Sequence, residues 1–320
     1  MGVRQARPRV TGARGRAAAL LAAVVLLTAA PAGAAPPIGV VTELHVKNGQ
    51  VEVKPSGGGQ WEPAKPLLSI AEGDQLRVSG AGRAVLVFAA SQRSAVVTSA
   101  NSPFVAAAPA QPSLGERIMA ALGFLQATPR EPRVGLTTRS PRDFSPVVML
   151  APRETRVAAD AIRLEWAGPE AERYTVRVLT GDGGVLWEKK SVEARPIAPA
   201  GNELRLVPGR YRWEVESLAH GIHRVTFDVA TPEAVAQAKA AVAAVDAAGY
   251  PSVTAALLRA AALMREGFHA DARRALLQTI AANPEEPTLH LLLADVYSKT
   301  RLDNLAAAEG QRSVDLSGGR

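Results

Sequence analysis

The chain has no cysteine, and this absence decides how it can be stabilised. Disulfides, thiolate metal sites and cysteine nucleophiles are all excluded. Aromatic residues make up only 4% of the sequence. Stability must therefore come from packed cores alone.

Acidic residues are absent from the first 34 positions, which instead carry five arginines. An apolar run over 17–30, broken only by Thr28, leads to Pro31-Ala32-Gly33-Ala34-Ala35. This is the pattern of a secretory signal peptide over 1–34, with cleavage after Ala34. Because the run is shorter than the ~20 residues of a spanning helix, an uncleaved membrane anchor is the less favoured alternative. We expect a periplasmic protein, or alternatively a secreted one. It would contact the membrane only if the leader were not cleaved.

The basic excess of the chain is largely a property of this leader. The leader holds five of the 37 basic residues and none of the 30 acidic ones, so the 286 residues after it have a net charge of +2. No basic stripe interleaved with aromatics follows, so we expect no nucleic-acid partner. The remaining length suits two or three domains.

Residues 38–105 are predicted to form a β domain. Apolar and polar residues alternate on both sides of Asn48-Gly49, which predicts a hairpin over 44–53. Further short strands are expected, separated by turns at Gly57-Gly58-Gly59 and Glu72-Gly73-Asp74: 75–78, 84–88 and 94–98. Such spacing is typical of a small antiparallel sandwich or barrel.

This zone resembles the FecR domain over roughly 65 residues. The resemblance rests on Gly39-Val40, Val46, Gly49-Gln50-Val51, Trp61 with Pro63-Ala64, Gly73 to Arg77, and Arg83 to Phe88. Val78 stands where the family usually has threonine, and Ala90-Ser91-Gln92 replaces its usual Asp-Gly-Ser hairpin. The resemblance implies a β-rich, non-enzymatic module of envelope and periplasmic proteins. In the iron-citrate regulator that names the family, this module passes a signal to a cytoplasmic segment that binds a sigma factor.

Residues 106–146 are predicted to contain a helix and a proline-rich linker. Ser113 and Glu116 form a capping box, and Ile118, Met119, Leu122 and Leu125 then share one helix face. The helix is expected to cover the first β domain, the alternative being a partner-binding role.

Residues 147–230 are predicted to be a β-sandwich of the immunoglobulin and fibronectin type III kind. Six or seven short strands fit into this zone. The resemblance to the fibronectin type III class rests on Trp166, Tyr174 and the string from Leu206 to Trp213 (Leu-x-Pro-Gly-x-Tyr-x-Trp). It implies an architecture and no particular activity.

Residues 231–320 are predicted to be an all-α helical repeat, so that the whole chain is multidomain. Thr231-Pro232-Glu233 begins a helix that extends to Ala248. A 34-residue spacing relates Ala238, Ala272 and Ala306, with Gly267 at a turn and Asn283-Pro284 at a repeat end. The zone thus resembles tetratricopeptide repeats. The second repeat has Arg301 in place of the turn glycine and Gly310 in place of a bulky residue, so its last helix is open to fraying. About three units are needed for a continuous core, so we expect this zone to lean on the sandwich or on a partner.

The sequence evidence for catalytic residues is weak throughout the chain. His220 and His223 are spaced like a metal clip but lie at a strand turn, and Glu285-Glu286 is predicted to be a solvated loop between repeats. Glu214 and Glu216 share the outer face of a strand. No nucleophile elbow, phosphate-binding loop or zinc-protease motif is present. We therefore expect no enzyme activity, no catalytic or metal site and no cofactor.

The module content favours an envelope scaffold or adaptor that binds other envelope proteins through the helical repeats. The residues predicted to line the binding face are Leu257, Arg259, Arg265, His290 and Lys299. One alternative is binding of peptidoglycan or polysaccharide, with Trp61 or Trp187 stacking on sugar. Another is FecR-type envelope signalling, which requires a cytoplasmic segment, whereas only 16 residues precede the apolar run.

Overall fold

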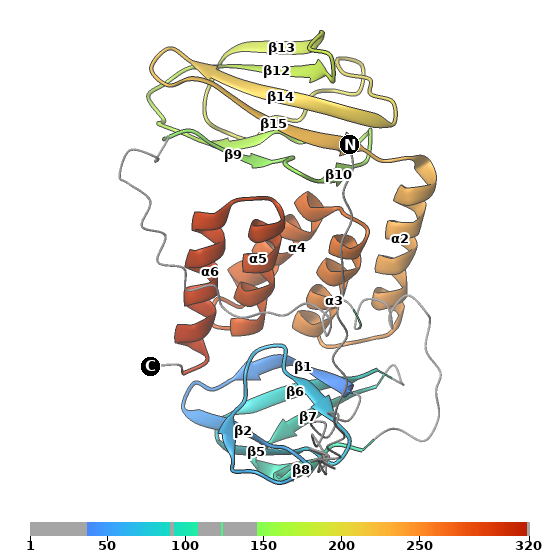
Figure 1. Cartoon of the computed structure of the whole chain (residues 1–320), viewed down its shortest axis with the longest axis vertical. Coiled ribbons are helices and arrows are strands. Elements are labelled where there is room, and N and C mark those ends of the chain that lie inside the picture. Colours follow the sequence, from blue (N-terminus) through green and yellow to red (C-terminus); the bar gives the residue numbers. More distant parts are fainter. Residues whose placement is uncertain (1–36, 90–92, 108–122, 124–145, 319–320) are drawn as a thin grey trace, which may run out of the picture. The chain divides into compact units, whose positions relative to one another are not determined.

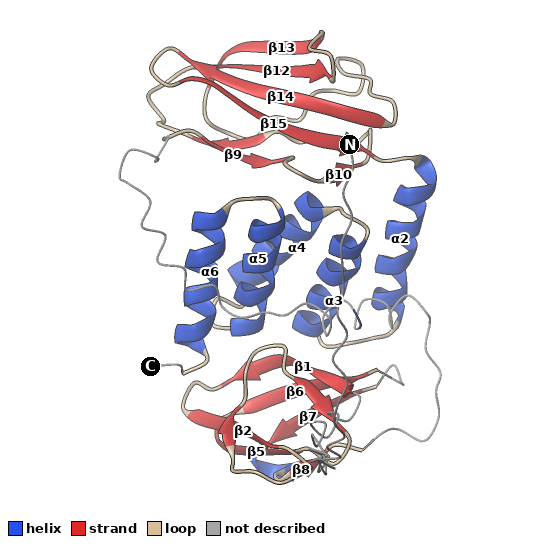
Figure 2. Cartoon of the chain, viewed as in Figure 1, coloured by secondary structure: helices blue, strands red, loops and turns tan. Residues whose placement is uncertain are grey.

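A β-rich region precedes five C-terminal helices in the computed structural model of the chain (Figures 1 and 2). The structure describes residues 37–89, 93–107, 123 and 146–318. The predicted leader over 1–34, the helix starting at Ser113 and most of the linker over 106–146 lie outside these residues. Residues 35–320 belong to one unit. Within the described part of the chain, no helix is long and apolar enough to cross a membrane.

The first β module consists of two antiparallel sheets. One has the strand order β4-β1-β6-β7 and the other β3-β2-β5-β8. Its elements are β1 (Pro37–His45), β2 (Gly49–Lys54), β3 (Glu62–Pro63), β4 (Ser69–Ala71), β5 (Gln75–Gly80), β6 (Arg83–Phe88), β7 (Ser94–Thr98), η1 (Ser99–Asn101) and β8 (Phe104–Val105). Side chains from both sheets, including Leu44, Leu76 and Leu86, share one buried cluster.

The turn at Asn48-Gly49 does not close the predicted hairpin. The strand before it, β1, pairs with β4 and β6, whereas the strand after it, β2, pairs with β3 and β5. Asn48 has a positive φ of 59°, as an Asn-Gly turn requires. The turn was therefore identified correctly, but it carries the chain from one sheet to the other.

The second β module contains a five-stranded sheet in the order β10-β15-β14-β12-β13 and the pair β11-β9. Its strands are β9 (Val148–Ala151), β10 (Arg156–Val157), β11 (Glu165–Ala167), β12 (Tyr174–Thr180), β13 (Val185–Val192), β14 (Gly209–Ser217) and β15 (Gly221–Val229). Met149 and Trp166 from the pair enter the same core as Val178 and Trp213 from the large sheet. The two sheets therefore face each other across shared apolar side chains.

Five helices complete the described chain: α2 (Pro232–Ala247), α3 (Ser252–Arg265), α4 (His269–Ala282), α5 (Pro287–Lys299) and α6 (Asp303–Leu316). Thr231 caps α2 by accepting a hydrogen bond from the backbone N–H of Ala234. The bounds of α4 and α6 differ by the 34 residues found in the sequence. The last helix, which was expected to fray, continues past Gly310 to Leu316.

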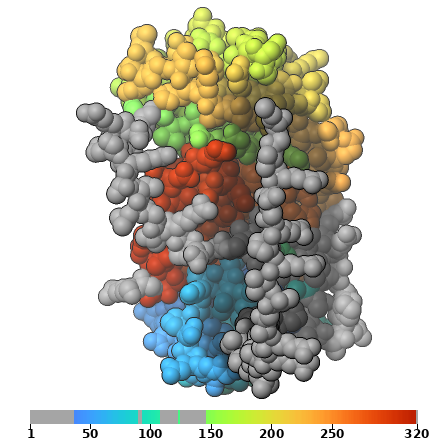
Figure 3. All heavy atoms as spheres, in the orientation of Figure 1, coloured from blue at the N-terminus to red at the C-terminus, as the bar shows by residue number. Residues whose placement is uncertain are grey.

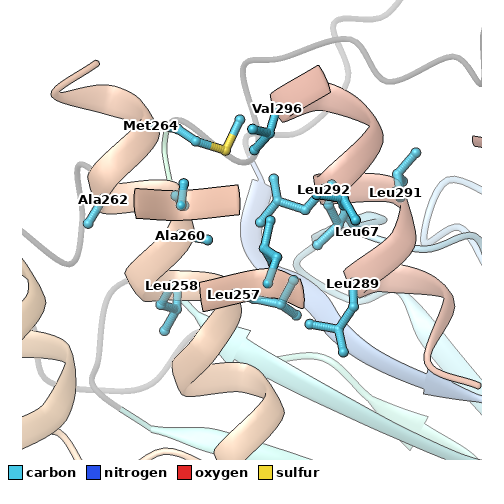
Figure 4. Close-up of a cluster of buried hydrophobic side chains, with 14 of the residues drawn as sticks. Leu67, Leu257, Leu258, Ala260, Ala262, Met264, Leu289, Leu291, Leu292 and Val296 are labelled. Atoms are coloured by element: carbon cyan, nitrogen blue, oxygen red, sulfur yellow. The ribbon is translucent and has the colours of Figure 1, made fainter. Parts of the chain in front are cut away.

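The core of the helical region lies between α3 and α5. Leu257 of α3 faces Leu289 and Leu292 of α5, as Figure 4 shows, and Leu258 belongs to the same buried cluster. Leu67 from the first β module enters the same cluster, as do Val40 and Val87. The helical core and the first module are thus continuous in apolar packing.

Candidate functional site

Strand β1 is buried on both faces where it meets the helices. Six consecutive residues, from Gly39 to Leu44, are buried in place of the alternation of a half-buried strand. Two of the six, Thr42 and Glu43, are polar. Buried polar groups need partners, and these two find them on α3.

Glu43 caps helix α3 from outside that helix. The residue before α3 is Pro251, which offers no side-chain cap. The Oε1 atom of Glu43 accepts hydrogen bonds from the Thr254 backbone N–H, at 3.2 Å, and from its hydroxyl, at 2.6 Å. Its other oxygen lies 2.6 Å from Nη1 of Arg83 on β6. A carboxylate placed at the positive end of a helix is stabilising, so this contact ties β1 to α3.

Glu286 makes the corresponding contact at helix α5. It is the N-cap residue of α5 and accepts from the Thr288 hydroxyl at 2.7 Å. The same carboxylate accepts the backbone N–H of Leu44 at 3.1 Å and lies 2.7 Å from Nδ1 of His45. This hydrogen bond to Glu286 raises the pKa of His45 above its usual value. Both helices therefore begin on acids that contact β1.

A hollow of about 720 Å³ opens beside these contacts. It is lined by the β1–β2 turn, the loop from Asn283 to Glu286, and the end of α6. Within it, Nζ of Lys47 lies 2.6 Å from a carboxylate oxygen of Glu285. Figure 3 shows red atoms of the C-terminal helices beside blue atoms of the first module in this part of the molecule.

The opposite ends of α3 and α5 meet arginines of the second β module. Nε of Arg153 donates to the Thr300 carbonyl at 2.7 Å, just after α5. Nη1 of Arg156 donates to the Glu266 carbonyl at 3.1 Å, just after α3. Carbonyls at a helix C-terminus have no partner within the helix, and the dipole there favours cations. The parallel helices α3 and α5 thus carry acids at their starts and arginines at their ends.

A partly buried ion pair adds to this second junction. Nη1 of Arg273 on α4 lies 2.7 Å from Oε2 of Glu165 on β11. Thr155 donates its hydroxyl to the Gly267 carbonyl and accepts the Ala270 N–H, which bridges the turn between α3 and α4. The expected support from the second module is therefore present as polar contacts.

The five predicted binding residues do not form one accessible face. Leu257 is fully buried and His290 is only 6% exposed, so a partner cannot reach either side chain. Arg259 pairs with Asp246 of α2. Arg265 and Lys299 are exposed in the last turns of α3 and α5, 34 positions apart. The prediction for Leu257 and His290 is wrong because both faces of α3 and α5 are packed.

The two acids predicted to form a solvated loop behave differently. Glu285 is exposed, but Glu286 is 1% exposed, because it turns inward as the cap of α5. The sequence analysis did not predict that Glu43 and Glu286 connect β1 to helices α3 and α5. The proline at the first position of α5 was a signal that Glu286 is an N-cap. No comparable signal marked Glu43.

The histidine pair predicted at a strand turn has a carboxylate neighbour. Nε2 of His220 lies 2.8 Å from Oε1 of Glu172, which precedes β12. No group of three metal-binding side chains occurs among the residues that the structure describes. On the outer face of the large sheet, Glu214 and Glu216 are paired with Arg224 and Arg177.

Neither tryptophan proposed for sugar stacking has a free ring. Trp187 is 8% exposed and belongs to the core of the second module. The guanidinium of Arg77 lies 4.4 Å from the ring centre of Trp61, where it makes a cation–π contact.

Comparison with known proteins identifies no family for this chain. No family model and no curated protein matches it. The solved structure of CopC from Methylosinus trichosporium OB3b is 20% identical, with a TM-score of 0.19 over 26% of this chain and 92% of CopC. PorZ of Porphyromonas gingivalis, an essential surface component of the type-IX secretion system, is 12% identical, with a TM-score of 0.21. The match covers 47% of this chain and 21% of PorZ, about a fifth of its length. Similarities this weak carry no argument about fold or function.

Proposed function

We propose that this chain is a non-enzymatic scaffold of the cell envelope, which presents two β modules on a helical support. The proposal rests on one observation, which is that charged side chains at the junctions between the modules bind the modules to each other. Glu43 and Glu286 each cap a helix while holding β1, and Arg273 pairs with Glu165 across the other junction. These groups join the β modules to the helices, as we expect of helices that support the modules.

We assign the modules to the classes that their sequences resemble. The first would be FecR-like; its Asp74 accepts the backbone N–H groups of Ser56 and Ala71, which fixes two turns. The second would be a fibronectin type III-like sandwich. The helices would be tetratricopeptide-like, in keeping with the spacing of α4 and α6.

We place the protein in the periplasm, or alternatively outside the cell, on the strength of the leader pattern over 1–34. The partner would be another envelope protein. It would meet the basic positions that are accessible, Arg265 and Lys299, together with Arg259. An acidic surface on the partner would complement these three side chains.

Charge reversal tests this partner surface directly. A triple variant, Arg259→Glu, Arg265→Glu and Lys299→Glu, would be compared with the unaltered chain in crosslinking to envelope proteins, followed by identification of the captured partner. We expect affinity for that partner to fall by at least about tenfold, which corresponds to about 1.4 kcal/mol. Lys239→Glu on the exposed side of α2 is the matched control and should leave capture unchanged.

Two results would count against the scaffold surface proposed here. Equal capture by the triple variant and the unaltered chain would remove these three residues from the interface. Sedimentation with purified cell-wall sacculi, unaffected by the three reversals, would instead assign the function to glycan binding by the β modules.

A further inference from the structure

His290 makes two hydrogen bonds that a neutral imidazole cannot make together. Its Nδ1 lies 2.6 Å from Oε2 of Glu309 on α6. Its Nε2 lies 3.0 Å from the carbonyl oxygen of Pro284, in the loop between α4 and α5. A carbonyl and a carboxylate both accept, so each ring nitrogen must carry a proton. The geometry therefore corresponds to the imidazolium form, balanced by Glu309.

Loss of that proton would leave one of the two contacts unmade. A neutral ring could keep the bond to Glu309 or the bond to Pro284, but not both. Because the His290 side chain is buried, its ring is fixed in place, and the acceptor that it abandons would lose its hydrogen bond to the protein. The charged groups that face the ring are Glu309 and Arg312, both on α6.

The loop that His290 holds is the same loop that holds the first β module. Glu285 of this loop contacts Lys47, and Glu286 contacts the backbone N–H of Leu44 and the ring of His45. The chain of contacts thus runs from α6 through His290 and the loop to the end of β1. Any movement of Pro284 is transmitted to Glu285 and Glu286, its immediate neighbours.

We propose that His290 is a proton-dependent clamp that fastens the 283–286 loop to α6 and thereby secures the first β module on the helices. In its protonated state the clamp is closed. When the proton leaves, the ring gives up its hydrogen bond to either Glu309 or the Pro284 carbonyl, the loop is no longer fastened to α6, and the contacts with β1 weaken. This inference requires no partner, so it stands or falls separately from the scaffold function.

The expected direction with pH follows from the environment of the ring. Burial disfavours the charge, yet the hydrogen bonds to Glu309 and the Pro284 carbonyl leave the pKa of His290 above its usual value of 6.5. A pKa raised in the folded state gives stabilisation that is complete below pH 6.5 and is lost as pH rises through the folded-state pKa. His45, whose pKa is raised by Glu286, acts in the same direction.

The first experiment follows hydrogen exchange of β1 and the loop in residues 35–320 between pH 6 and pH 8.5, after correction for the intrinsic rate. We expect protection of segments 40–46 and 283–290 to fall several-fold as pH rises through the folded-state pKa of His290, because the stabilisation by the imidazolium is then lost. His290→Gln keeps a neutral side chain of similar reach and should weaken that pH dependence. His220→Gln in the second module is the control and should retain it.

A second measurement keeps the proposal testable if His290→Gln fails to fold. Imidazole ¹⁵N resonances would give the pKa of His290 and its protonation state in the unaltered chain and in Glu309→Gln. Loss of the carboxylate should lower the pKa of His290, because the hydrogen bond to Glu309 favours the charged ring. An unchanged pKa in Glu309→Gln, a neutral ring at pH 6, or identical exchange profiles in the unaltered chain and His290→Gln would each overturn the proposal.

Discussion

Two residues at equivalent positions after α3 and α5 adopt the left-handed conformation. Gly267 has a φ of 83° and Arg301, 34 positions later, has a φ of 57°. Glycine adopts this conformation freely, whereas it costs an L-residue about 1–2 kcal/mol. The sequence showed that the glycine was missing at Arg301, but it did not show that the backbone keeps the same shape there.

Exchange of these residue types should change stability in opposite directions. Arg301→Gly relieves the backbone and should raise the free energy of unfolding by about 0.5–1 kcal/mol, after the greater freedom of glycine in the unfolded chain is subtracted. Gly267→Ala should lower it by about 1 kcal/mol or more, because alanine is strained at a φ of 83°. Urea unfolding measures both. A gain from Gly267→Ala would contradict the assigned backbone shape.

The glycine within α6 offers a second test at the residue scale. Gly310 is buried, yet a carbon added at its Cα would meet nothing within 4 Å. Alanine favours a helix interior over glycine by about 0.5–1 kcal/mol, so Gly310→Ala should raise the midpoint of thermal unfolding. A lower midpoint would mean that the space beside α6 is filled.

At the scale of elements, strand β1 shows where sequence reasoning stops. Alternation predicted strand β5, in which Leu76 and Val78 are buried and the residues between and beside them are not. Strand β6 has no such alternation, because all its residues from Ala84 to Phe88 are buried. Alternation also predicted a hairpin at Asn48-Gly49. That prediction was wrong because periodicity gives no information about which strands pair. Glu43 lies in a strand with both faces covered, one by the second sheet and one by helices, and a single sequence does not reveal the second cover.

Helix α3 should depend on the carboxylate of Glu43. Glu43→Gln removes the charge that faces the helix N-terminus and Arg83, and we expect a loss of about 2 kcal/mol in the free energy of unfolding. The comparison is Glu62→Gln on β3, an exposed position whose change should stay within about 0.5 kcal/mol. If both variants unfold at the same urea concentration, the capping role of Glu43 is wrong.

The start of α2 and the helical repeat spacing were predictable from the sequence, whereas the surroundings of the helices were not. Thr231-Pro232 marked the start of α2 correctly, and the 34-residue spacing reproduced α4 and α6. The predicted binding face failed at Leu257 and His290, because repeat spacing indicates which residues are equivalent but not what packs on them.

At the scale of the whole molecule, the helices depend on both β modules. A support from the second module was expected, whereas the apolar and polar contacts with the first were not. Both sets of contacts join residues more than a hundred positions apart, such as Arg156 with Glu266 and Leu44 with Glu286. Pairings of this length leave no local trace in the sequence.

Removal of the arginines at the second junction should free the helix ends that they cap. In Arg153→Ala with Arg156→Ala, the carbonyls after α5 and α3 lose their donors, and the free energy of unfolding should fall by about 1–2 kcal/mol. Hydrogen exchange should become faster in the last turns of both helices. Arg210→Ala, whose side chain pairs with Asp228 on the outer sheet face, is the control. Unaltered exchange in those turns would show that the arginines do not secure the junction.

The central claim is that the helices and the β modules are held together as one unit. All four tryptophans (Trp61, Trp166, Trp187 and Trp213) lie in the β modules, whereas α2 to α6, the α-helices whose bounds the structure describes, lie within residues 232–316. Urea unfolding of residues 35–320 should therefore be followed by tryptophan fluorescence and by circular dichroism at 222 nm on the same sample. Coincident transitions are predicted. A helical transition that separates clearly from the fluorescence transition would contradict the account.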